Sequence, residues 1–240
     1  MSTEIFFQLQ EELAPVLQAG DTARCELTVA ERLSAMPRSP FHIALDLAFT
    51  NPLSEVATHF DRFFRQEASR FPIGAAYTEM NGFDINPDRW YFDVFAYKRY
   101  GGHDNYDWLS DWQSGSYEDM TLTGFEPLQA VYAGEAFEDD EFREAAYVAG
   151  LLVVAKYQDF IGRVVPLMRE LRFPLLVTAH EYDFIYEVRP EVRIRNFGDH
   201  LILVDATRSG YNTNNPIKAL LGSRISALWR KKSSAINIST

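Results

Sequence analysis

The sequence lacks several features that would assign a protein to a common class. It contains one cysteine, Cys25, which excludes a framework of intramolecular disulfide bonds. The longest charge-free apolar run covers residues 145–155, far fewer than the roughly 20 residues that a membrane-spanning helix needs. The first residues lack the basic and apolar regions of a secretory signal. We therefore expect a soluble, cytoplasmic protein that has no membrane partner.

Motifs for common catalytic chemistry and metal binding are also missing. The sequence contains no GxSxG nucleophile elbow, Gly-rich phosphate loop, HExxH, CxxC or EF-hand pattern. These absences count against the common hydrolase, kinase and dinucleotide-binding classes. We expect neither a cofactor nor a bound metal.

Acidic residues outnumber Lys and Arg in the chain before residue 218, whereas the C-terminal residues are basic. Residues 218–240 hold five Lys and Arg residues and no acid, so within a net charge of -11 the first 217 residues carry -16. A body with this charge repels nucleic acid and attracts cationic partners. We expect a basic protein partner and no nucleic-acid partner.

The pattern of apolar residues predicts an α+β fold, in which several helices pack on a mostly antiparallel sheet. We expect one domain over residues 1–232 and a frayed tail over 233–240. The helices are expected at residues 4–18, 51–70 and 217–229, with one long buried helix near 138–171. The strands are expected at residues 42–50, 75–83, 89–99, 120–125, 173–179, 181–189, 191–195 and 201–207. The runs 75–83 and 89–99 should form a hairpin.

One candidate site is the run of reactive side chains from His180 to Asp183. In a strand, Glu181 and Asp183 would point to one face, and His180 and Tyr182 to the other. Two carboxylates held close together raise the pKa of one of them, as in acid–base pairs. A solvated strand face, or an ion pair with a basic neighbour, is the alternative interpretation.

A second candidate is the loop that begins at Gly101, which is rich in aromatic and acidic residues. Aromatic side chains provide contact area, and surrounding carboxylates orient a basic partner. The alternative is that both indoles form a small core under the loop. The predicted binding surface consists of Asp107, Trp108, Asp111, Trp112, Glu118 and Asp119.

Two further features bear on ligand binding. Arg193 and Arg195 share a face of a predicted hairpin and match the geometry of an anionic ligand, although they also neutralise the acidic body. His103 and Asp104 suit divalent ions but lack the spacing of a known metal site, so we interpret them as part of a polar loop.

These observations favour a non-enzymatic protein that binds another protein. A concrete form is an immunity or antitoxin-like inhibitor of bacterial type, which covers the active-site cleft of a basic toxin. One alternative is a hydrolase-like enzyme that uses Glu181 and Asp183, with His42 or His103 brought in by the fold. Another is a homo-oligomeric structural protein that buries its exposed aromatic residues at a twofold interface.

Overall fold

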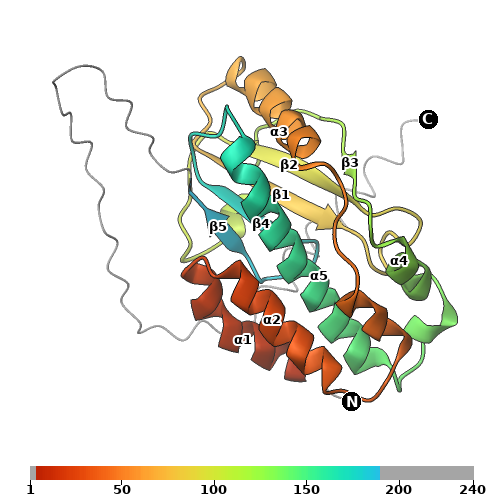
Figure 1. Ribbon diagram of the computed structural model, residues 1–240. Helices are drawn as coiled ribbons and strands as arrows, with labels where there is room; N and C mark the ends of the chain where they lie inside the picture. The colour runs from red at the N-terminus through yellow and green to blue at the C-terminus, as the bar shows by residue number, and fades with distance from the viewer. Residues whose placement is uncertain (1–3, 190–240) are drawn as a thin grey trace. The chain divides into compact units, whose positions relative to one another are not determined.

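A computed structural model describes residues 4–189 of the protein (Figure 1). The described residues lie in one compact unit. Its α-helices are α1 (Glu4–Gln18), α2 (Thr22–Ser34), α3 (Leu53–Ala68), α4 (Glu126–Tyr132) and α5 (Arg143–Val164). Short 3-10 helices are η1 (Pro40–Leu45), η2 (Asp107–Ser110), η3 (Glu135–Phe137) and η4 (Val165–Leu167). The strands are β1 (Ala75–Asn81), β2 (Tyr91–Tyr97), β3 (Met120–Thr121), β4 (Leu175–Ala179) and β5 (Tyr186–Val188).

The five strands form one sheet in the order β3-β2-β1-β4-β5. The β1–β4 pair is parallel, and the other three pairs are antiparallel. The α5 helix crosses one face of the sheet, and α1 and α2 pack along the helix (Figure 1). The predicted α+β class, with a mostly antiparallel sheet and one long buried helix, is confirmed.

The predicted hairpin of residues 75–83 and 89–99 is also confirmed. Strand β1 pairs with β2 from Ala75 opposite Tyr97 to Asn81 opposite Tyr91. Side chains alternate along each strand, so that Ala76, Met80 and Phe92 face the helices. The opposite face carries a smaller apolar cluster with Tyr77 and Tyr97, which the loop after β2 covers.

The long helix is shorter than the predicted range of 138–171. Asp139 accepts a hydrogen bond from the Glu141 amide at 2.9 Å, which forms a local turn before the helix begins at Arg143. Pro166 lies in η4 and ends the regular helix, because proline lacks the amide hydrogen that continues it. Sixteen of the 22 helix residues are buried, which explains why apolar residues surround the helix axis.

The predicted strand at residues 42–50 is wrong. The segment begins as the 3-10 helix η1, in which Phe41, His42 and Ala44 are buried while Ile43 is exposed. The ring nitrogen Nδ1 of His42 accepts a hydrogen bond from the Ser39 amide at 3.1 Å, and Pro40 occupies the first turn. This local cap and the packing of α5 outweigh the alternating apolar pattern.

Asn51 and Pro52 precede α3, and the Asn51 side chain does not cap that helix. Its side chain donates to the Thr121 carbonyl and accepts from the Thr123 amide, both at 2.9 Å. Asn51 therefore joins the entrance of α3 to the edge of the sheet. The sequence patterns also missed α2 and α4 as helices.

The predictions for the C-terminal quarter lie outside the described residues. They include the hairpin of residues 191–207, the helix 217–229, the anion-binding pair Arg193 and Arg195, and the frayed tail. The single domain over residues 1–232 therefore stays a prediction.

Candidate functional site

A group of ionisable side chains lies on the sheet face that turns away from α5. Glu79 on β1 stands directly opposite Asp93 on β2 in the antiparallel register. Residues in such pairs have Cβ atoms about 5 Å apart, so the two carboxylates share one small site. Glu79 is only 4% exposed, and Asp93 is partly exposed. We call these two residues the carboxylate pair.

Both carboxylate oxygens of Glu79 accept hydrogen bonds. The Tyr77 hydroxyl donates to one oxygen at 2.6 Å, and His180 Nδ1 lies 2.8 Å from the other. This contact holds the imidazole of His180 against Glu79, as an orienting carboxylate does in many catalytic sites.

Asp93 has the electrostatic properties of a proton carrier. Burial and the neighbouring Glu79 carboxylate raise the pKa of Asp93 from 3.8 to about 6. Asn81 donates a hydrogen bond to Asp93 at 3.1 Å and so partly stabilises the charged form. An acid that titrates near neutral pH can both give and accept a proton under ordinary conditions.

The run from His180 to Asp183 does not form the predicted strand. Strand β4 ends at Ala179 and a turn follows, with Glu181 in the left-handed region at φ 65°. Glu181 and Asp183 are exposed in this turn, whereas His180 contacts Glu79. The predicted two-faced arrangement of these four residues is therefore wrong, because it required an extended backbone.

The two indoles of the aromatic loop, Trp108 and Trp112, pack against the face of the sheet that the loop covers. Trp108 lies against Tyr97 with ring centroids 4.8 Å apart, and its Nε1 donates to the Gly102 carbonyl at 2.9 Å. Trp112 lies against Phe95 at 5.1 Å. Both indoles are partly buried, as the alternative interpretation of a small core expects.

The acids of the predicted binding surface differ in their surroundings. Asp107 and Asp111 are exposed at the two ends of η2. Glu118 is exposed and lies 3.9 Å from Arg62. Asp119 instead accepts two hydrogen bonds from Arg89, at 2.7 and 2.8 Å, so its charge is largely neutralised.

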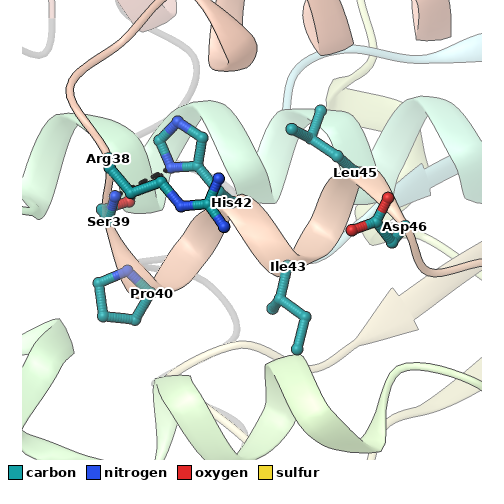
Figure 2. A pocket seen from close by; sticks show the side chains of 7 residues that line it. All are labelled: Arg38, Ser39, Pro40, His42, Ile43, Leu45 and Asp46. Atoms are coloured by element: carbon teal, nitrogen blue, oxygen red, sulfur yellow. Dashed lines mark hydrogen bonds between the residues drawn. The ribbon is translucent and has the colours of Figure 1, made fainter.

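A surface cavity of about 560 Å³ lies beside η1. In Figure 2, Arg38 and Asp46 lie toward opposite ends of the group of residues that line it. His42 lines it, but its ring turns back to Ser39, whose hydroxyl lies 3.0 Å from Nδ1. His42 Nε2 is buried and has no hydrogen-bond partner among the described residues. This arrangement is a helix cap, and it does not bring His42 to the carboxylate pair.

The other predicted ligand, His103, lies in the loop after β2. His103 is exposed in the loop, with its Nδ1 3.4 Å from the Tyr100 hydroxyl. Among residues 4–189, no three His, Cys, Asp or Glu side chains gather closely enough to hold a metal ion. No helix in this range has the length and apolar composition needed to cross a bilayer.

Sequence reasoning missed both members of the carboxylate pair, although one signal was present. Asp93 stands between Tyr91 and Phe95 in a strand whose two faces are otherwise apolar or aromatic. A carboxylate at such a position must be buried or paired, which makes it unusual. Its pairing with Glu79 depends on the register between β1 and β2, which the sequence pattern of one strand does not determine.

The chain matches no protein-family model, no curated protein and no solved structure.

Proposed function

We propose that this protein binds a basic protein through an acidic surface built by residues 100–142. This range, the acidic segment, contains eleven Asp and Glu residues and no Lys or Arg. Ten of the eleven acids are exposed, and Asp119 is partly buried. The absence of Lys and Arg over 43 consecutive positions is the observation that carries the proposal.

Few of these charges are neutralised within the fold. Among the described residues, three acids of the segment form an ion pair with a basic side chain: Glu118, Asp119 and Asp140. The exposed pairs contribute little, because water screens them. The remaining carboxylates are available to attract and orient a cationic partner.

The packed indoles support binding indirectly, because they hold the loop in position. Trp108 and Trp112 hold the loop against the sheet, so that Asp107 and Asp111 project from an ordered backbone. A surface that is ordered before binding loses less conformational entropy when the complex forms. We therefore assign the indoles to support of the loop and the carboxylates to contact.

A toxin inhibitor is the form of this function that the charge favours most. Enzymes that act on nucleic acids carry basic clefts, and an acidic protein surface imitates the phosphate backbone that such clefts bind. An immunity or antitoxin-like protein needs no catalytic group for this task, and steering by charge brings it to its target rapidly.

A triple charge reversal tests the proposal. Asp107→Lys, Asp111→Lys and Glu118→Lys together should strongly reduce capture of the partner from a lysate of the source cells, and the capture that remains should depend less on salt. The matched control is Glu11→Lys, Glu12→Lys and Glu31→Lys, which changes the net charge equally at exposed positions on α1 and α2. Equal capture by both triple variants at low salt would refute the proposed surface.

The carboxylate pair favours a second candidate function, namely acid–base catalysis by a hydrolase-like enzyme. It is a better candidate than the exposed Glu181 and Asp183, because Glu79 and Asp93 are held together by the sheet. Asp93 would exchange the proton, and Glu79 would orient His180. The surrounding negative charge suits neutral or cationic substrates rather than phosphate esters.

The variant Asp93→Asn tests the proton-carrying role of the pair. A folded pKa above the unfolded value means that protonation stabilises the fold below about pH 4, and that this stabilisation is lost as the pH rises through about 6. At about pH 8 the variant should therefore gain roughly 1–2 kcal/mol in the free energy of unfolding. Urea unfolding over a pH series measures it.

The controls for this variant are Glu181→Gln and Asp183→Asn, which replace the exposed carboxylates of the turn. Glu181→Gln should leave the stability profile unchanged in this pH range, whereas Asp183→Asn should make the protein somewhat more stable as the pH rises, because burial also raises the pKa of Asp183. If a substrate screen finds hydrolase activity, Asp93→Asn should remove it and both controls should retain it. Activity that survives in Asp93→Asn but is lost in Asp183→Asn would assign the catalytic role to Asp183 in the turn after β4.

A further inference from the structure

One buried histidine lies directly beneath the acidic segment. His59, on α3, is 6% exposed, and its ring contacts Phe92 and Tyr117 at centroid distances of 5.4 and 4.9 Å. Its Nε2 has no hydrogen-bond partner among the described residues. A buried polar atom without a partner is uncommon and costs free energy, so it requires an explanation.

Tyr117 joins this histidine to the acidic segment. Its hydroxyl donates to the backbone carbonyl of His59 at 3.3 Å, and its ring also packs on Phe63 at 5.1 Å. The same stretch is held at Gly115, whose amide donates to the buried Glu67 carboxylate at 3.3 Å. Residues 115–119 therefore depend on the apolar packing of Tyr117 between its two fixed ends, Gly115 and Asp119.

The charges around His59 come from two elements. Glu118 and Asp119 in the acidic segment attract the protonated ring, and Arg62 on α3 repels it. Phe92 on β2 supplies no compensating charge. Burial is the largest influence, and it lowers the pKa of His59 below its ordinary value of 6.5. The buried site offers the charged imidazolium no hydrogen-bond acceptor for Nε2, whereas the Glu118 carboxylate is a partner for it at the surface.

We propose that His59 is a pH-sensitive latch for residues 115–119 of the acidic segment. In the neutral state the ring packs under Tyr117 and orders this stretch. In the protonated state the ring moves outward toward Glu118, which displaces Tyr117 and frees the stretch. The regulatory role of the latch rests on the proposed binding function, because the displaced residues include Glu118 of the binding surface.

The sign of the effect follows from linkage. The folded state disfavours protonated His59, so stability from this group is complete above about pH 6.5 and is lost as the pH falls below that value. This direction is opposite to that of Asp93, which gains stability on mild acidification. Variants of the two residues therefore separate the two contributions.

Hydrogen–deuterium exchange of the full chain tests the latch without any partner. Amides of residues 115–119 should lose about tenfold in protection between about pH 7.5 and pH 4.5, after correction for intrinsic exchange rates. His59→Phe keeps an aromatic ring that cannot titrate, and it should retain protection throughout. His103→Gln, at an exposed histidine, should respond as the wild type does.

Two results would overturn the latch. One is an equal loss of protection in His59→Phe and in the wild type, and the other is unchanged protection in the wild type. If His59→Phe fails to fold, His59→Leu replaces it, and an NMR titration of the His59 ring in the wild type reports its protonation directly. A confirmed latch with partner capture that is insensitive to the triple charge reversal would refute the binding function alone.

Discussion

Replacing Lys156 with Met is expected to lower the free energy of unfolding by about 3 kcal/mol, since it leaves buried carbonyl groups without a donor. Lys156 lies on α5 and is 8% exposed. Its ammonium donates to the carbonyl oxygens of Ala44, Leu45 and Leu47 at 3.0, 3.3 and 2.5 Å. Methionine has a similar length but cannot donate these hydrogen bonds. Urea unfolding at constant pH measures the loss.

The lysine also explains how the end of η1 and the residues just after it are held on α5. Burial lowers the pKa of Lys156, while the carboxylates of Glu26 and Asp46 oppose this shift. The ammonium therefore replaces the strand partners that the carbonyls of residues 44–47 would have in a sheet. If the ammonium is removed, these three carbonyl oxygens lose a hydrogen-bond donor that no other described side chain replaces.

Lys98→Met is the matched control for this variant. Lys98 is exposed, and its ammonium lies 5.8 Å from the centre of the Phe71 ring. Its replacement should change the free energy of unfolding by less than about 0.5 kcal/mol. A loss of similar size in the two variants, or no loss in Lys156→Met, would contradict the role assigned to the buried ammonium.

Gly124→Ala is expected to be the most damaging single substitution, with a loss of about 4 kcal/mol or failure to fold. Gly124 follows β3 and has a φ of 104°, a backbone angle that residues other than glycine rarely adopt. An added Cβ would also overlap the carbonyl oxygen of Ala48, which is backbone and cannot turn aside. The contact joins the segment before α3 to the edge of the sheet, where Thr50 donates to the Thr123 carbonyl at 3.0 Å.

Gly20→Ala separates the two parts of this effect. Gly20 has a similar φ of 82°, but nothing lies within 4 Å of the position of an added Cβ. Backbone strain alone should cost about 1 kcal/mol at this position. Thermal unfolding of both variants measures the difference, and equal losses would show that the approach of Ala48 contributes nothing.

Strand β2 connects the two titrating groups that matter most for the proposals. Phe92 packs on His59 on one face of the strand, and the next residue, Asp93, faces Glu79 on the other. Acidification therefore acts on one strand in two opposite directions. A pH profile of the wild type alone would hide both contributions, whereas the single variants reveal them.

Local sequence patterns predicted a large part of the fold correctly. The hairpin of β1 and β2 follows from two apolar runs separated by Asp84 to Asp88, a composition typical of turns. The buried α5 follows from its continuous apolar sequence. The segment of residues 42–50 was misread because alternation describes only one strand, while η1 is stabilised by Ser39, His42 and Lys156.

The sequence by itself determined the α+β class, the net negative charge of the first 217 residues and the run of 43 residues that contains no Lys or Arg. These properties depend on composition and on short-range periodicity, which each segment carries independently of the others. Three contacts were decided by the tertiary structure alone. Glu79 pairs with Asp93, and His180 contacts Glu79 and is not grouped with Glu181 and Asp183. The ring of His59 packs under Tyr117. Those contacts join residues far apart in the chain, so they depend on strand register and on packing between elements, which no single segment encodes.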